Sequence, residues 1–214
     1  VPSRYLKSIV QQWGVKEDKI EVIYNATNLS VVDKKEFSDR PTILSVGRLV
    51  DWKGFGQLID LMSRLVKENP ELLLLIVGDG PLRNELQNKI NDLGLNNNIQ
   101  LTGKVTKDKV YQYMQKADVF VLNTSYEGSP HVVLEAMSAR LPIIITRVGG
   151  NLEIINDGEN GFLFNLGDVE DLRKKIELLL NDKSLGKRLS DTAYKNVQRY
   201  SWENNLKSLV NLIT

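Results

Sequence analysis

Short apolar runs alternate with longer amphipathic stretches along most of the chain. The runs, which are rich in leucine and β-branched residues, predict strands at 42–46, 72–77, 99–101, 119–122, 142–146 and 161–164. The amphipathic stretches between them predict helices at 55–68, 82–93, 107–116, 130–138 and 151–156. Strands that alternate with helices on this rhythm indicate an α/β fold, in which helices cover both faces of one parallel sheet.

The pattern changes at the two ends of the chain. Three helices are predicted in succession at 169–180, 185–198 and 202–213. A short helix at 3–13 and a short strand at 20–24 come first, and the polar stretch 25–40 then interrupts the rhythm. We therefore interpret residues 1–40 as the tail of another unit, joined to the sheet by a linker.

Composition narrows the classes of function. The 214 residues are 42% hydrophobic, enough for one sizeable core, and the longest apolar run is far too short to cross a bilayer. The 28 Lys and Arg residues balance 27 Asp and Glu residues, so no overall positive field favours nucleic acid. With no cysteine and one histidine, thiol chemistry and a zinc site are not expected, and the composition fits a reducing, cytoplasmic compartment.

Two glutamates, Glu127 and Glu135, are the first candidates for chemistry. One precedes a predicted helix and the other falls in its second turn. Pro130 suits a first helical turn, and Gly128 allows the backbone to approach a ligand closely. We expect the helix to begin near Ser129 and to present unpaired N–H groups to a phosphate, while the two carboxylates accept hydrogen bonds from sugar hydroxyl groups.

The same residues also fit a plainer interpretation. A carboxylate just before a helix favours the helix dipole, and one in the second turn is often simply solvated. His131, in the first turn, is either a ligand or a capping and packing residue. The residues alone leave these alternatives open.

A second candidate is the loop after the first predicted strand. Gly47, Arg48, Lys53 and Gly54 place a guanidinium and an ammonium between two glycines. A planar donor fork and a mobile point charge suit the unlike oxygens of a diphosphate, although two surface cations beside a turn would show the same pattern. Because the carboxyl ends of parallel strands share one edge of a sheet, we expect this loop to lie near Glu127.

Two further loops join strands to helices through pairs of glycines. Gly78 and Gly80 match neither the dinucleotide-binding nor the P-loop spacing, and we expect them to serve a tight turn and the close approach of a neighbouring loop. Gly149 and Gly150 could bind a phosphate or sugar hydroxyls through their amides. Glu153 belongs either to that site or to the dipole of its own helix.

Taken together, these motifs resemble the donor-binding C-terminal domain of GT-B glycosyltransferases of the large retaining GT4-type group, the glycosyl transferases group 1. The resemblance runs from about Ser3 to the end of the chain, through the ordered segments 22–25, 46–48, 53–54, 78–81, 103, 127–137, 149–150 and 158–161. It implies a Rossmann-like sheet that forms the C-terminal half of such an enzyme.

The resemblance also implies roles for individual residues. Glu127 and Glu135 match the E-x7-E motif of the family, in which the first carboxylate faces the donor sugar and the second the nucleotide ribose. Arg48 and Lys53 match the diphosphate ligands, so Arg48, Lys53 and Glu127 are the expected catalytic residues. The segment 103–105 lies where family members contact the base. The expected donor-binding residues are Gly47, Arg48, Lys53, Gly103, Lys104, Val105, Glu127, Gly128, Ser129, Pro130, His131, Val132 and Glu135.

By the same resemblance the chain divides into three parts. Residues 1–40 are the end of an N-terminal domain and a linker, 41–199 form the donor-binding domain, and 200–214 form a helix that crosses back to the missing domain. The chain departs from the family at Arg140 and Leu141, where a small residue or glycine often precedes the proline that matches Pro142.

The implied activity is transfer of a hexosyl group from a nucleoside-diphosphate sugar, with retention of anomeric configuration. The acceptor, a glycan, lipid or small molecule, would be bound by the missing N-terminal domain, and that domain could also hold the enzyme at a membrane surface. No acidic pair suggests a metal, and no cofactor is expected. A nucleotide-sugar epimerase of the same fold and a non-catalytic nucleotide-sugar-binding module are the alternatives.

Overall fold

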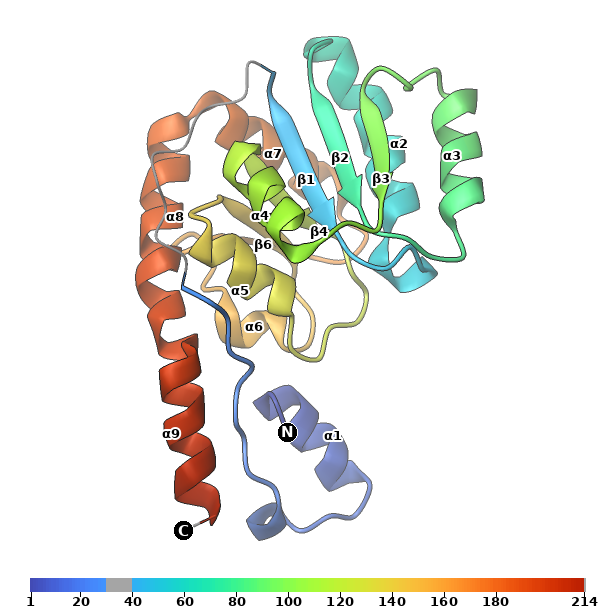
Figure 1. The fold of residues 1–214 in the computed structure, drawn as a ribbon. Helices are drawn as coiled ribbons and strands as arrows, with labels where there is room; N and C mark the ends of the chain where they lie inside the picture. Colours follow the sequence, from blue (N-terminus) through green and yellow to red (C-terminus); the bar gives the residue numbers. More distant parts are fainter. Residues whose placement is uncertain (30–39, 214) are drawn as a thin grey trace.

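The strands form one parallel sheet. A computed structural model describes residues 1–29 and 40–213 (Figure 1). Within these ranges the strand order is β3-β2-β1-β4-β5-β6, and every neighbouring pair is parallel. The strands are β1 (Thr42–Val46), β2 (Leu73–Val77), β3 (Ile99–Gly103), β4 (Val119–Leu122), β5 (Ile143–Thr146) and β6 (Phe162–Phe164). The predicted α/β fold with a parallel sheet is therefore confirmed.

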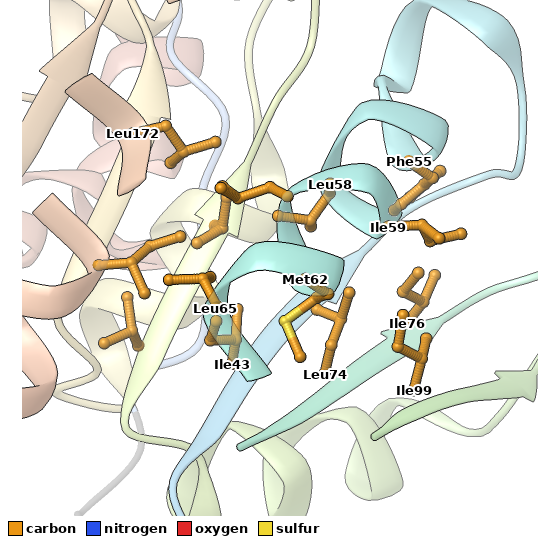
Figure 2. Packing of buried hydrophobic residues seen from close by; sticks show 14 of the residues in the cluster. Ile43, Phe55, Leu58, Ile59, Met62, Leu65, Leu74, Ile76, Ile99 and Leu172 are labelled. Carbon is orange, nitrogen blue, oxygen red and sulfur yellow. The ribbon is translucent and has the colours of Figure 1, made fainter. Parts of the chain in front are cut away.

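Helices cover both faces of the sheet. Along β1, Ile43 faces one apolar cluster and Leu44 the other, because successive side chains of a strand point to opposite faces. The first cluster is closed by α2 (Phe55–Glu68), α3 (Arg83–Asp92) and α7 (Val169–Asn181). The second is closed by α4 (Lys107–Lys116), α5 (His131–Ser138) and the end of α8 (Lys183–Val197). Figure 2 shows the first cluster, where Leu58 and Met62 of α2 lie over β1 and β2.

Two helices lie apart from the sheet. The first, α1 (Arg4–Gln12), precedes the short 3-10 helix η1 (Glu17–Lys19), and the last, α9 (Trp202–Ile213), follows η3 (Gln198–Tyr200). Figure 1 shows α1 and α9 extending beyond the same end of the domain. No helix of the described ranges has the length and apolarity needed to cross a bilayer.

The predicted strand at 20–24 is wrong. This stretch is extended but joins neither edge of the sheet. Ile23 instead donates to the carbonyl of Val1 at 3.0 Å, and Thr27, just beyond the stretch, forms an isolated bridge with Ser201. The apolar pattern correctly indicated burial, since Ile20 is buried. The stretch is buried, however, without pairing with a strand of the sheet. The expected linker 25–40 falls in part on residues 30–39, which lie outside the described residues.

The strand order reverses between β1 and β4. Strand β1 pairs with β2 on one side and with β4 on the other, so the connections that leave the carboxyl ends of β1 and β4 diverge from one another. In open α/β sheets a ligand crevice forms at such a point. The loops 47–54 and 123–130, which hold the main candidates, leave the sheet there.

Candidate functional site

The loops after β1 and β4 are tied together at the crevice. The backbone carbonyl of Trp52 accepts hydrogen bonds from the amide of Ser125 at 2.8 Å and from the hydroxyl of Thr124 at 3.0 Å. Lys53 ends the short 3-10 helix η2 (Asp51–Lys53), and Gly54 follows in the left-handed region with φ 63°. A Cβ on Gly54 would lie 2.2 Å from the carbonyl oxygen of Asn123, so only glycine lets the two loops approach this closely.

This contact brings Lys53 and Glu127 together. The Nζ atom of Lys53 lies 2.7 Å from Oε2 of Glu127, and their side chains are only 16% and 15% exposed. Two candidates from loops 74 residues apart therefore form one ion pair at the crevice. A partly buried pair of this kind is weakly screened by solvent, so removal of either partner leaves an uncompensated charge.

The Gly149–Gly150 turn packs against the backbone of the loop that carries Glu127. The amide of Gly150 donates to the carbonyl of Glu127 at 2.8 Å, and a Cβ on Gly149 would lie 2.1 Å from that same oxygen. A Cβ on Gly150 would lie 2.3 Å from the carbonyl of Gly128. The Gly150 amide is thus used inside the protein, and these glycines pack the loop instead of offering both amides to a ligand.

The start of α5 differs slightly from the sequence expectation. The helix begins at His131, with Pro130 as its N-cap, two positions later than the predicted start near Ser129. The Pro130 carbonyl accepts from Val133 at 3.1 Å and from Leu134 at 3.4 Å, which closes the first turn. No side chain caps this end, and no acidic residue lies in the first turn. The first amides, including that of Val132, therefore remain available to an anion.

The second glutamate lies on the side of α5 that faces α4. Burial raises the pKa of Glu135, while the charges of Lys107 and His131 lower it. Glu135 and His131 line a pocket of about 470 Å³ together with Lys107 and Trp202. Glu135 is half-buried and His131 is exposed. A carboxylate that lines this pocket offers hydrogen-bond acceptors to a ligand bound there.

The remaining candidates lie at the same edge but differ in exposure. Arg48 and Lys104 are exposed, and Val105 is half-buried against the second apolar cluster. Gly103 has φ 75°, and its carbonyl accepts from the amide of Gly78 at 3.1 Å. Within residues 1–29 and 40–213, no group of three His, Asp or Glu side chains is placed to hold a metal ion.

The expected packing role of the Gly78 loop is confirmed. A Cβ on Gly78 would lie 1.9 Å from the carbonyl oxygen of Gly47, and one on Gly80 would lie 2.5 Å from that of Leu49. The amide of Leu49 donates to the carbonyl of Asp79 at 3.0 Å. These contacts hold the backbone that carries Arg48 in place.

Comparison with known proteins supplies the family. The model of the family described as glycosyl transferases group 1 matches residues 28–196. The chain belongs to this family. It is 33% identical, over 192 residues, to the lipopolysaccharide core biosynthesis glycosyltransferase LpsE of Rhizobium meliloti, a match that covers 87% of this chain and 54% of LpsE. The chain thus spans about half the length of this relative.

Solved structures show the same fold. TarM of S. aureus, solved as a mutant in complex with fondaparinux, α-GlcNAc-glycerol and UDP, superposes with a TM-score of 0.85 at 25% identity. That match covers 96% of this chain and 41% of TarM. Alr3699/HepE of Anabaena, in complex with UDP, gives 0.88 at 22% identity, over 100% of this chain and 62% of HepE. The chain therefore has the fold of a C-terminal GT-B-type glycosyltransferase domain.

Sequence reasoning missed two contacts of this glycosyltransferase domain. The sequence predicts no role for Asn25, yet its side chain contacts Ser129 beside the start of α5. Glu153 lies in the first turn of its own short helix, as one of the two expectations had it, and its carboxylate also accepts hydrogen bonds from the backbone amides of Arg4 at 3.0 Å and Tyr5 at 2.8 Å at the start of α1. Residues about 104 and 149 positions apart leave no local pattern that would reveal such pairs.

Proposed function

We propose that this chain is the donor-binding domain of a retaining glycosyltransferase that uses a nucleoside-diphosphate sugar and transfers its hexosyl group. The observation that carries the proposal is the Lys53–Glu127 ion pair, which lies at the switch point of the sheet beside the uncapped start of α5. A cation, free helix amides and a carboxylate acceptor are the groups that a diphosphate joined to a sugar requires. The UDP bound by TarM, a structural neighbour at 25% identity, supports the assignment.

In this proposal Lys53 serves the diphosphate and the sugar together. An ammonium group has three N–H donors. Lys53 therefore donates one hydrogen bond to Glu127 and has two N–H groups left for phosphate oxygens. A charge at about 4 Å from a phosphate contributes roughly 4 kcal/mol at an effective dielectric near 20, before desolvation. Arg48, exposed on the same loop, supplies the second cation, and Glu127 accepts hydrogen bonds from sugar hydroxyls.

Transfer breaks the bond between the anomeric carbon and the β-phosphate oxygen, whose electron pair leaves with the nucleoside diphosphate. The acceptor hydroxyl forms the new bond on the same face of the sugar, and its proton passes to the departing phosphate. Lys53, Arg48 and the amides of α5 stabilise the negative charge that builds on this oxygen, because they are already oriented when the reaction begins. Glu127 orients the sugar and is not assigned as a nucleophile.

The diphosphate assignment is tested by nucleotide affinity. Calorimetric titration of the full-length protein with UDP, GDP, ADP and dTDP identifies the base, and the tightest ligand is then titrated into Arg48→Ala and Lys53→Ala. We expect losses of about tenfold or more, since each variant removes a charged hydrogen bond. Unchanged affinity in both variants would overturn the assignment.

The two glutamates are separated by comparing the free nucleotide with its sugar-bearing form. Glu135→Ala is expected to weaken the nucleoside diphosphate itself, because the carboxylate accepts from the ribose. Glu127→Ala is expected to weaken mainly the nucleotide sugar. The reverse pattern would exchange the two roles.

We also propose that residues 41–199 form the donor domain, and that the acceptor is bound by sequence present in the relatives but not in this chain. Incubation of the full-length protein with donor and acceptor, followed by NMR of the anomeric proton in the product, tests for transfer with retention. Product formed in the presence of EDTA would support the proposal that Arg48 and Lys53, and not a metal ion, stabilise the departing diphosphate. Epimerised donor in the absence of any acceptor would instead favour the epimerase alternative.

A further inference from the structure

A residue of the N-terminal segment reaches the diphosphate-binding end of α5. The side-chain amide of Asn25 donates to Oγ of Ser129 at 2.9 Å and to the carbonyl oxygen of Ser129 at 3.1 Å. Both residues are half-buried. A carbonyl only accepts, so the group that faces it must be the NH₂ of Asn25, which settles the orientation of the amide. Ser129 is thus held at its backbone and its side chain by one group.

The segment that carries Asn25 is itself held on both sides. The carbonyl of Tyr24 accepts from the side-chain amide of Asn205 at 2.6 Å, and the Tyr24 hydroxyl donates to Glu153 at 2.9 Å. The amide of Thr27 donates to the carbonyl of Tyr200 at 2.9 Å. Because these contacts flank Asn25, its amide stays in one position, and Ser129 with it.

The contact sets the direction in which Ser129 donates. A hydroxyl has one proton, and the amide of Asn25 contributes only N–H groups, so Oγ of Ser129 accepts from Asn25 and keeps its proton for another acceptor. The neighbouring Pro130 has no N–H, and the next amides belong to the uncapped start of α5. A phosphate oxygen is an acceptor that would satisfy the hydroxyl and these amides together.

We propose that Asn25 is a positioning residue for diphosphate binding, which makes the hydroxyl of Ser129 a preoriented hydrogen-bond donor at the start of α5. The inference rests on the proposed function, because it assigns Ser129 to the diphosphate of the donor. It also makes the nucleotide affinity depend on the segment that precedes the sheet. The sheet and its loops alone would then not suffice for full donor affinity.

Titration of the full-length protein with UDP tests the proposal. Asn25→Asp replaces the NH₂ by an acceptor, which draws the Ser129 proton away from the phosphate, and we expect about tenfold weaker UDP binding. The matched control is Asn204→Asp, which removes a side-chain amide contact to the carbonyl of Gln198 and touches neither Ser129 nor the segment that holds Asn25, and its UDP affinity should stay within about twofold of wild type. If Asn25→Asp does not fold, Asn25→Ala is titrated in its place, and we expect a smaller loss of UDP affinity.

A double-mutant cycle separates positioning from a general structural effect. Ser129→Ala should also weaken UDP about tenfold, and the double variant should lose little beyond either single variant, because both remove the same hydrogen bond. Additive losses of about a hundredfold, or wild-type affinity in Asn25→Asp, would overturn the inference and leave the proposed function standing. If the wild-type protein binds none of UDP, GDP, ADP and dTDP, the proposed function fails and this inference with it.

Discussion

At the scale of single residues, surroundings decide what each ionisable group does. Lys53 and Glu127 compensate one another at 2.7 Å, whereas Glu135 forms no ion pair within residues 1–29 and 40–213, and burial raises its pKa. Carboxylates with shifted pKa values cluster at functional sites, where ligands use their acceptor atoms. Glu135 is therefore the residue at which stability and binding should trade against each other.

The substitution Glu135→Gln should stabilise the protein and weaken the nucleotide. Burial raises the folded-state pKa of Glu135 above the usual 4.5, so the folded protein binds this proton more tightly than the unfolded chain does. The unfolding free energy of the wild type therefore falls as the pH rises from 4.5 through the folded-state pKa. Glutamine does not ionise, so the variant should have the higher unfolding free energy at pH 7. This difference should vanish below about pH 4, where Glu135 is protonated in both states. Urea unfolding at both pH values measures it. A variant less stable than wild type at pH 7 would contradict this explanation, and UDP affinity should fall about tenfold.

Arg140 shows a compensated strain at the end of α5. Its φ is 52°, in the left-handed region that favours glycine, and it follows the C-cap residue Ala139. The guanidinium lies 3.9 Å from the ring centroid of Tyr194 and 2.6 Å from Asp191, both on α8. These two contacts on α8 offset the cost of the left-handed backbone at Arg140.

Replacement of Arg140 should separate strain from contact. Arg140→Ala keeps the strained φ and loses the stacking and the ion pair, so we expect a loss of about 1–2 kcal/mol in unfolding free energy. Arg140→Gly loses the same contacts but relieves the strain, and it should be less destabilising by about 1 kcal/mol. Equilibrium urea unfolding of both variants provides the comparison. The opposite ranking would show that the backbone at this position is not strained.

At the scale of elements, a short helix joins the N-terminal segment to the site. Helix α6 (Asn151–Ile154) carries Glu153, whose carboxylate receives two backbone amides of α1 and the hydroxyl of Tyr24. The turn just before α6 supports Glu127 through the amide of Gly150. Helix α1 and the Glu127 loop are thus attached to the same few residues, which couples their positions.

The substitution Glu153→Gln should loosen α1 and change the titration of Tyr24. Burial, then the hydrogen bond and charge of Glu153, raise the pKa of Tyr24 to about 12 from 10.0. Stability contributed by the neutral phenol is full below pH 10.0 and is lost as pH rises toward about 12. In the variant, ultraviolet titration should place this pKa nearer 10.0, and the amides of Arg4 and Tyr5 should exchange faster.

The control for this experiment is Glu159→Gln, in a nearby surface turn. Glu159 contacts the side chain of Asn156 at 3.3 Å and none of the α1 amides that Glu153 binds. Exchange at Arg4 that rises equally in both variants would mean that Glu153 does not hold α1.

At the scale of the whole molecule, α9 carries an apolar face that the sheet does not cover. Trp202, Leu206 and Val210 are each more than half exposed. We propose that the N-terminal domain implied by the longer relatives covers this face. LpsE, of which this chain spans 54%, has the additional length that such a domain needs.

The substitution Leu206→Asp should therefore affect transfer without affecting donor affinity. Placing a charge in a domain contact should lower kcat of the full-length enzyme by about tenfold, while UDP affinity stays within about twofold. Leu178→Asp is the matched control, because Leu178 is 43% exposed against 55% for Leu206 but lies on α7. Equal effects of the two substitutions on kcat would argue against a domain contact at α9.

Much of the fold could be predicted because its signals are local. Strand β1 and helices α2, α4 and α9 have the bounds expected from the pattern of apolar residues, since periodicity and glycine positions act within a few residues. The candidate loops also lie at one edge of the sheet, as parallel strands require. The strand predicted at 20–24 is wrong because an apolar run indicates that a segment is buried, but not which segment it pairs with.

The sequence by itself determined the parallel α/β fold, the residue types at the site and, by resemblance, the glycosyltransferase family. Only the tertiary structure decided which groups meet: Lys53 with Glu127, Asn25 with Ser129, and Glu153 with the start of α1. The physical reason is range. Helix and strand preferences are set by neighbours along the chain, whereas a hydrogen bond between residues a hundred positions apart depends on how the whole chain packs.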